Sequence, residues 1–179
     1  ITLPSPKTGY KYTGYYVGST KYYNTNGTSA RNWDIASNSS AVLKADCTAK
    51  SYTINFNCNG GTGSTSSMSM TYDAAKNLSP NGCQKTSYEF THWTTNANGT
   101  GSSYTNGQSV NNLTSTDGGT ITLYAQWKLS NYDVYYNANG GSGSMSKSTF
   151  AYGSTYNLRS NTFTRAGFTF TGWNTKADG

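Results

Sequence analysis

A short run of alternating aromatic and polar residues occurs three times in this chain, and each run ends on a large aromatic residue. The runs span residues 8–15, 86–93 and 166–173. Side chains on a β-strand point to opposite faces in turn, so the alternation predicts a strand in each run. The aromatic positions of this motif are Tyr10, Tyr12, Tyr15, Tyr88, Phe90, Trp93, Phe168, Phe170 and Trp173.

In a regular strand, the three aromatic residues of a run could not all point to the same face. The first two in each run, such as Tyr88 and Phe90, are two residues apart, so we expect them to line one buried face. Trp93, three residues after Phe90, has the opposite parity. Either a bulge lies near His92, or both faces of the strand are partly covered. The same alternatives apply to the run that ends at Trp173.

Further strands are predicted by the same criterion. Residues 52–56 alternate most clearly, with Tyr52, Ile54 and Phe56 predicted to point inward. Residues 68–72 predict the returning strand, and residues 121–127 a closing strand. Only residues 73–76 suggest a turn of helix. The fold class predicted from the pattern is therefore mainly β with little helix.

The chain repeats itself along its length. Residues 52–99 align without a gap with residues 132–179, and 18 of these 48 positions are identical. The spacing from Tyr10 to Tyr88 is slightly shorter than that from Tyr88 to Phe168, so a small insertion or deletion separates the first copy. The repeat predicts three segments: the C-terminal part of a repeat (1–50), a complete repeat (51–130) and the N-terminal part of a further repeat (131–179).

Two expectations follow from this organisation. Residues 128–131 form a predicted four-residue linker, which leaves little freedom between neighbouring repeats. A chain that begins and ends inside repeats is expected to be part of a longer array. Incomplete repeats would also expose strand edges that can pair with another molecule.

The recurring elements resemble those of a known family. They are the strand and Gly-Gly turn of residues 52–61, the aromatic motif of residues 167–173, the polar run 174–179 and the closing strand 121–127. In this order they are similar to the internalin-type B repeat, or Listeria–Bacteroides repeat, of bacterial surface proteins. The resemblance implies small, tandem β-grasp-like modules outside the cell, one for each repeat, and it does not imply an active site. The first copy departs from the pattern, because Tyr15 replaces the motif tryptophan and Cys47 the closing one.

Composition suits small modules with thin cores. Hydrophobic residues make up 34% of the chain, charged residues 11% and aromatic residues 15%. The aromatic residues provide core material that a disordered chain lacks. A repeat as short as this one buries little surface, so its stability is expected to be modest.

The charge pattern argues against two classes of partner. The formal net charge is +6, but the basic residues are scattered rather than clustered, so we expect no nucleic-acid partner. No run of 18 apolar residues occurs, so no membrane span is expected in this segment.

The residues that catalysis requires are scarce. His92 is the only histidine and Glu89 the only glutamate, and no Cys-x-x-Cys spacing occurs. His92 aligns with Gly172 inside a predicted strand, which favours a structural role. We therefore predict no catalytic, cofactor-binding or metal-binding residues, and no enzyme activity.

The cysteines suggest a crosslink. Cys58 aligns with Ala138 and Cys83 with Phe163, both apolar positions. One hypothesis is a disulfide between Cys58 and Cys83 that stabilises a thin core in an oxidising exterior, with Cys47 left single. The alternative is three buried thiols.

Two functions remain open at this point. The first is a structural stalk or fibre whose partners are neighbouring repeats of the same or adjacent chains. The second is an adhesin-type module that binds a host protein or glycan through exposed aromatic residues. Tyr124 and Tyr135 lie at outward-facing positions of their strands and are the candidate ligand-facing residues. Both functions place the segment on the bacterial cell surface.

Overall fold

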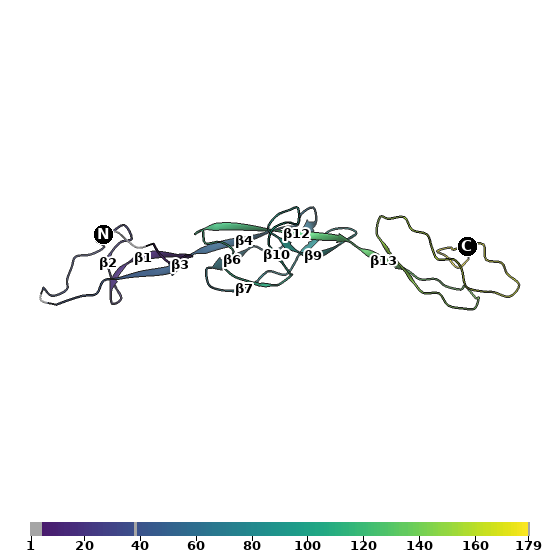
Figure 1. Ribbon diagram of the computed structural model, residues 1–179, viewed down its shortest axis with the longest axis horizontal. Coiled ribbons are helices and arrows are strands. Elements are labelled where there is room, and N and C mark those ends of the chain that lie inside the picture. Colours follow the sequence, from purple (N-terminus) through teal and green to yellow (C-terminus); the bar gives the residue numbers. More distant parts are fainter. Residues whose placement is uncertain (1–4, 38, 179) are drawn as a thin grey trace. The chain divides into compact units, whose positions relative to one another are not determined.

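The structure of the chain, a computed structural model, describes residues 5–37 and 39–178. Residues 1–4 and 38, in the predicted first repeat, and residue 179, in the third, lie outside the described residues. All regular structure assigned over the described ranges is β-strand, with no helix (Figure 1). The prediction of a mainly β fold is therefore confirmed.

The strands are short, apart from three of seven to eleven residues at the centre of the chain and one of eight near its start. In chain order they are β1 (Tyr10–Val17), β2 (Thr20–Tyr23), β3 (Lys44–Ala49), β4 (Ser51–Asn57), β5 (Thr62–Gly63), β6 (Met68–Thr71), β7 (Lys76–Asn77), β8 (Cys83–Gln84), β9 (Tyr88–Thr94), β10 (Ser103–Tyr104), β11 (Ser109–Val110), β12 (Gly119–Leu129), β13 (Asn131–Val134) and β14 (Ser148–Ala151).

The chain divides into two compact units. One consists of residues 1–85 and 90–126, and the other of residues 86–89 and 127–179. Along the sequence we call residues 5–49 the first copy, residues 51–129 the central module and residues 131–178 the third copy.

The central module contains a five-stranded sheet with the order β10-β9-β12-β4-β6. Its first strand, β4, and its last, β12, are parallel neighbours, with Tyr52 opposite Gly119 and Ile54 opposite Ile121. β6 is antiparallel to β4 on the other side. Parallel neighbours need a long connection, and here that connection includes every other strand of the module.

The core of the central module follows from the alternation in β4 and β12. Tyr52 and Ile54 are buried on β4, and Leu123 and Ala125 are buried on β12. The other buried apolar residues of the module are Met70, Leu78, Cys83, Trp93 and Val110. Burial of an Ile, Leu or Met side chain contributes about 1.5–3 kcal/mol, so a few such residues stabilise this small sheet.

The aromatic motif of β9 faces the core differently from our prediction. Trp93 is fully buried, and its ring lies 4.9 Å from the rings of both Phe56 and Phe90. Tyr88 is 37% exposed, so the prediction that Tyr88 lines a buried face is wrong. Trp93 and its neighbour Thr94 are both buried, which means that both faces of β9 are covered at this point.

The first copy shows the other alternative, a bulge. It forms a three-stranded sheet in the order β2-β1-β3. The register of β1 against β3 shifts between Tyr12 and Gly14, where Gly14 is the counterpart of His92. Tyr15, which replaces the motif tryptophan, is buried after this shift, and its ring lies 6.2 Å from that of Tyr12.

The third copy forms only part of the expected sheet. β13 and β14 pair antiparallel, but residues 168–173 carry no strand assignment. Phe168 is 67% exposed and Phe170 is also exposed, while Trp173 is half-buried. The predicted strand and buried face at Phe168 and Phe170 are therefore wrong. In the central module β9 pairs with β12, and the described residues of the third copy include no such closing strand.

The predicted helical turn is a tight reverse turn instead. Residues 72–73 form the turn, and Asp73 has a φ of 62°. Aspartate tolerates this left-handed conformation better than most residues. The chain then enters β7, which pairs with β11, so no helix can continue.

Candidate functional site

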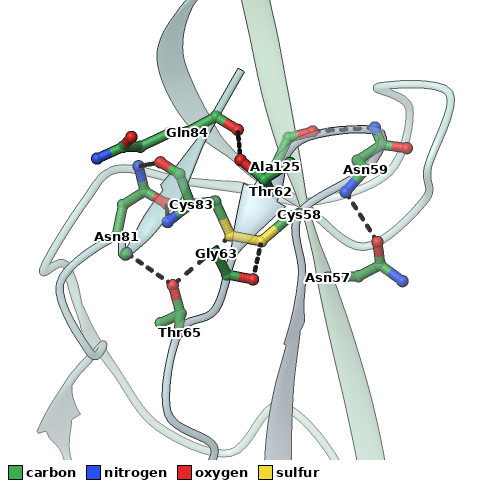
Figure 2. The surroundings of a disulfide bond; sticks show 11 residues. Asn57, Cys58, Asn59, Thr62, Gly63, Thr65, Asn81, Cys83, Gln84 and Ala125 are labelled. Carbon is green, nitrogen blue, oxygen red and sulfur yellow. Dashed lines mark hydrogen bonds between the residues drawn. A yellow bond between two sulfur atoms is a disulfide. The ribbon is translucent and has the colours of Figure 1, made fainter. Parts of the chain in front are cut away.

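The structure joins Cys58 and Cys83 in a disulfide whose Cα atoms lie 5.5 Å apart (Figure 2). Cys58 directly follows β4, and Cys83 begins β8, which pairs with β5. Asn81 orients Cys83, because its side chain accepts from the Cys83 N–H at 2.9 Å and donates to the Cys83 carbonyl at 3.0 Å. Cys47 is a free, exposed cysteine. The alternative of three buried thiols does not describe this arrangement.

The third copy builds the same corner without the crosslink. Asn161 bonds both the N–H and the carbonyl of Phe163, at 2.9 and 3.0 Å. Ser142 and Thr164 form a β-bridge like that between Thr62 and Gln84. The polar framework therefore forms independently of the sulfur atoms, and the disulfide adds a covalent tie to it.

A single residue connects neighbouring copies. β3 ends at Ala49 and β4 begins at Ser51, so only Lys50 lies between them. The Lys50 N–H donates to the Gly9 carbonyl at 2.8 Å, and the Lys50 carbonyl accepts from the Tyr72 N–H at 2.8 Å. Since Gly9 belongs to the first copy and Tyr72 to the central module, Lys50 is bonded to both.

The same connection recurs at Ser130. β12 ends at Leu129 and β13 begins at Asn131. The Ser130 N–H donates to the Ser87 carbonyl at 2.9 Å, and its carbonyl accepts from the Tyr152 N–H at 2.8 Å. The linker predicted over residues 128–131 is therefore a single residue in the structure, because strands include the other three.

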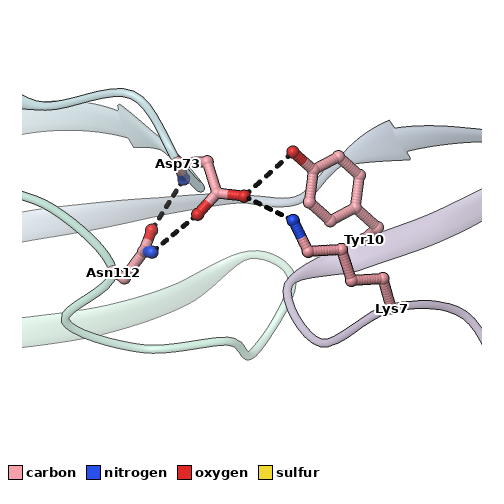
Figure 3. Close-up of polar contacts among 4 residues, drawn as sticks. All are labelled: Lys7, Tyr10, Asp73 and Asn112. Atoms are coloured by element: carbon pink, nitrogen blue, oxygen red, sulfur yellow. Dashed lines mark hydrogen bonds and ion pairs between the residues drawn. The ribbon is translucent and has the colours of Figure 1, made fainter.

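Side chains reinforce the junction at Lys50. Asp73 accepts hydrogen bonds from Lys7 Nζ at 3.2 Å and from the Tyr10 hydroxyl at 3.0 Å, both through Oδ2 (Figure 3). Its Oδ1 accepts from Asn112 Nδ2 at 2.8 Å, while the Asp73 N–H donates to Asn112 Oδ1 at 2.6 Å. One carboxylate thus links the first copy to two loops of the central module.

A close approach of backbone to ring lies beside this carboxylate. Gly9 is buried against Tyr72, and a Cβ atom on Gly9 would lie 2.1 Å from the Tyr72 ring. Gly9 also has a φ of 78°, which favours glycine. The Tyr10 and Tyr72 rings meet edge to face with centroids 6.3 Å apart.

A second ion pair crosses the same junction. Lys11 Nζ lies 2.6 Å from Asp117 Oδ2, and Asp117 Oδ1 accepts from the Ser51 N–H at 3.3 Å. Lys50 Nζ donates to the Ser115 carbonyl at 3.2 Å. Individually such exposed contacts contribute little. Here one ion pair from the first copy and two bonds from Lys50 and Ser51 hold residues 115–117 beside the junction.

The junction shifts the titration of its charged groups. The hydrogen bond from Asn112, followed by those from Lys7 and Tyr10, lowers the pKa of Asp73. The bond from Lys11 lowers the pKa of Asp117, and the bond to Asp73 raises the pKa of Lys7. Each of these pKa shifts favours the charged form of its group, which is the form that makes the ion pairs of the junction.

The sequence did not point to these junction residues. They come from three separate stretches of the chain and belong to no recognised motif: Lys7, Asp73, and Asn112 with Asp117. Tyr72 offered the one signal, because it is identical to Tyr152 in the repeat. In both copies the N–H of this tyrosine is bonded to the single residue that connects neighbouring copies.

The two candidate ligand-facing residues differ in exposure. Tyr124 is half-buried on β12, whereas Tyr135, directly after β13, is 75% exposed. Lys147 Nζ lies 6.0 Å from the centroid of the Tyr135 ring. The two tyrosines belong to different compact units.

No convergent set of catalytic or metal-binding groups is found among the described residues. Within residues 5–37 and 39–178, no group of three or more His, Cys, Asp or Glu side chains is placed to hold a metal ion. A hollow of about 350 Å³ beside Val110 is lined by neutral side chains such as Gln108 and Asn111. Over the same residues, no helix has the length and apolar character needed to span a membrane.

Comparison with known proteins identifies the repeat. The Listeria–Bacteroides repeat domain matches residues 52–126 and 132–179, which is more than half of the chain. The chain belongs to this repeat family. No enzymatic family is indicated.

Two curated proteins of Evansella cellulosilytica are similar to parts of the chain. A "Putative Gly-rich membrane protein" is 36% identical over 99 residues, which cover 53% of this chain and 11% of that protein. A "Putative membrane protein" is 44% identical over 63 residues, or 33% of this chain and 9% of that protein. The chain therefore spans about a tenth of the length of these relatives. No solved structure matches it.

Proposed function

We propose that the chain is a structural repeat segment of a bacterial extracellular surface protein, in which tandem modules form a stalk or fibre. The observation that carries this proposal is the repeated one-residue connection. Lys50 and Ser130 each bond through the backbone to the copy before and the copy after. A connection that is hydrogen-bonded on both sides restricts the bending of one module against the next.

The modules are of the β-grasp-like, internalin-type B form. In support, the first and last strands of the central module are parallel neighbours inside a mixed sheet with the order β10-β9-β12-β4-β6. The partners of each module are the neighbouring repeats. Short modules joined in tandem can gain stability from their neighbours, as in other repeat proteins.

The proposed location is the outside of the bacterial cell. Disulfides persist in oxidising surroundings, and Cys58 and Cys83 form one here. The similar proteins of Evansella cellulosilytica are described as membrane proteins, which is consistent with presentation at the cell surface.

A linker insertion tests the stalk role. A Gly-Ser-Gly-Ser segment placed between Lys50 and Ser51 separates the copies while leaving their strands intact. Small-angle X-ray scattering should show a more flexible particle than the original chain, with a broader distribution of interatomic distances. The same insertion after Ser66, in an exposed loop without strand pairing, is the control and should leave the curve unchanged. Equal flexibility of the original chain and the Lys50 insertion would contradict the proposal.

A second function, adhesion to a host protein or glycan, is favoured by the exposure of Tyr135. Its ring is 75% exposed on a chain with few charges, and such a ring can stack on a sugar or pack against a protein. Glycan and extracellular-matrix arrays would show binding that Tyr135→Ala abolishes and Tyr88→Ala retains. If no binding is detected and the insertion after Lys50 increases flexibility, the structural role is the one function that the two experiments support.

A further inference from the structure

The central module has a hollow beside Val110, where residues 105–108 connect β10 to β11. The hollow has a volume of about 350 Å³ and is lined by Tyr104 and by residues 108–113. Small-molecule sites in proteins have volumes of about 300–1,000 Å³, so this hollow is large enough for a ligand of one ring. Its lining residues all belong to the central module, in which both the first strand, β4, and the last, β12, are present.

Hydrogen bonds fix the backbone around the hollow. The Gln108 carbonyl accepts from the Leu78 N–H at 2.9 Å, and Gln108 Oε1 accepts from the Thr105 N–H at 2.8 Å. At the other end of the lining segment, the Leu113 N–H donates to the Tyr52 hydroxyl at 3.3 Å. Between these two points β11 pairs with β7. A site that is already held in this way loses little conformational freedom when a ligand binds.

Asn112 gives the hollow one further fixed side chain. Its Oδ1 accepts from the Asp73 N–H at 2.6 Å, and its Nδ2 donates to Asp73 Oδ1 at 2.8 Å (Figure 3). Because these two bonds engage both ends of the amide, we assign Asn112 to the wall of the hollow and not to the groups that contact a ligand.

Four other polar groups of the hollow remain available. Among residues 5–37 and 39–178, no side chain or backbone group bonds the Tyr104 hydroxyl, the Ser109 hydroxyl, the Asn111 amide or Gln108 Nε2. Hydroxyl groups and the asparagine amide both donate and accept, while Gln108 Nε2 donates. Together they can bond several hydroxyl groups of one ligand at once.

The remaining surface of the hollow narrows the class of ligand. Val110 is buried, and Tyr104 and Leu113 are half-buried beside it, so part of the surface is apolar. None of the residues that line the hollow carries a charge. A sugar ring presents C–H groups on its faces and hydroxyl groups around its edge, and a tyrosine side chain offers an apolar ring with a polar tip. A neutral sugar therefore fits both the apolar and the polar part of the lining.

We propose that this hollow binds one neutral hexose unit of a glycan. The hydroxyl groups of the sugar bond to Gln108, Ser109 and Asn111, and its C–H groups pack against the Tyr104 ring. The dissociation constant is expected to be on the order of millimolar, because the contacts of one sugar ring only modestly exceed the cost of losing translational and rotational freedom.

This site goes beyond the proposed structural role and is separate from Tyr135. Tyr135 belongs to the other compact unit, so Tyr135→Ala is expected to leave binding in the hollow unchanged. The linker-insertion test of the stalk role does not depend on the hollow. Failure of either proposal therefore leaves the other intact.

The test is an NMR titration of the whole chain with the methyl glycosides of glucose, mannose, galactose and N-acetylglucosamine. Methyl glycosides are used because, like a unit within a glycan, they have no free reducing end. At least one of the four should give saturable shift changes at the amides of residues 108–111 and at the Tyr104 ring. Glucose 6-phosphate should bind no more tightly than methyl glucoside, since the hollow offers no cation to hold the phosphate.

Two variants remove ligand contacts and keep the frame of the hollow. Asn111→Ala, at an exposed position, removes one amide, and Gln108→Glu removes the Nε2 donors while keeping an acceptor for the Thr105 N–H. Each should weaken binding about fivefold or more, the loss expected when one hydrogen bond of about 1 kcal/mol is removed. Asn55→Ala and Gln84→Glu are the matched controls at exposed positions outside the hollow, and they should bind like the parent chain.

Three results would overturn the proposal. The first is the absence of saturable shift changes with all four glycosides, and the second is a set of changes that lies outside residues 104–113. The third is equal binding by the two variants and their controls. Tighter binding of glucose 6-phosphate than of methyl glucoside would overturn the assignment to a neutral sugar.

Discussion

The Tyr10 hydroxyl donates a hydrogen bond of 3.0 Å to Asp73 Oδ2, across 63 positions of sequence. Lys7 Nζ bonds the same oxygen and lies 4.9 Å from the centroid of the Tyr10 ring. A phenol, an ammonium group and a carboxylate therefore meet where the first copy joins the central module.

Removing the charge of Asp73 should loosen the junction. In Asp73→Asn the contacts with Lys7 and Tyr10 lose their ionic character, while the backbone bond to Asn112 can remain. We expect several-fold faster amide exchange at Lys50 and Tyr72, whose N–H groups are bonded across the junction, and little change at Ile54. Asp178→Asn, at an exposed position of the third copy, is the control and should change none of these rates.

The junction should also weaken in acid. The pKa of Asp73 is lowered in the folded chain, so its contribution to stability is complete above the ordinary value of 3.8 and is lost as the pH falls through the lowered value. NMR shifts of the Tyr10 and Tyr72 rings should therefore move at a pH below 3.8. In Asp73→Asn this transition should disappear. A midpoint at or above the ordinary value in the parent chain would contradict the assignment.

Substitution of Gly9 separates steric contact from backbone strain. Gly9→Ala places a methyl group 2.1 Å from the Tyr72 ring at a φ of 78°. Gly18→Ala has a similar strain, with a φ of 58°, but no atom within 4 Å of the added carbon. We expect Gly18→Ala to cost about 1 kcal/mol and Gly9→Ala about 2 kcal/mol or more in urea unfolding of the first copy. Equal costs would show that contact with Tyr72 does not constrain the junction.

Loss of the disulfide should destabilise the central module. Cys58 and Cys83 are 25 residues apart, and closing a loop of this length contributes about 3 kcal/mol in the chain-entropy description. The double variant Cys58→Ala/Cys83→Ala should lose about that amount in denaturant unfolding while keeping its strands, since the third copy builds the same corner without sulfur. Cys47→Ser, at the exposed free thiol, should unfold like the parent.

Asn59 should tolerate neither loss of its amide nor a negative charge. Its Nδ2 donates to the Ala97 carbonyl at 2.8 Å and to the Ala125 carbonyl at 2.9 Å. Asn59→Asp removes both donors and faces a carboxylate with two carbonyl oxygens, at a cost of about 2 kcal/mol. Asn98→Asp is the matched control, because Asn98 uses only its oxygen, toward Thr100. Similar unfolding of the two variants would show that the amide donors of Asn59 contribute nothing.

Some of the fold could be predicted from local sequence. The alternation of Tyr52 and Ile54 predicted a buried face, and both are buried on β4. The same criterion failed at Phe168 and Phe170, where the pattern is as clear but no closing strand is present among the described residues. Strand formation depends on a partner that is distant in sequence, so a local pattern indicates only the capacity to form a strand.

The junction could not be predicted for a related reason. Lys7 and Asp73 are ordinary surface residues by type, and their pairing depends on the turn at Asp73 and on the path of the chain through Lys50. The alternation was equally uninformative about Trp93, which is fully buried although it should point to the opposite face from Phe90. Contacts made by turns between distant segments leave no periodic trace in the sequence.

The parallel pairing of β4 and β12 determines how the central module would carry tension. A pull along the chain enters at Ser51, the start of β4, and leaves at Leu129, the end of β12. Because the two strands are parallel neighbours, such a pull slides one along the other and loads all the hydrogen bonds between them at the same time. Antiparallel terminal strands would instead separate one bond at a time, like a zip. The central module is therefore expected to resist stretching by shear, which is the loading that the proposed stalk role would place on it.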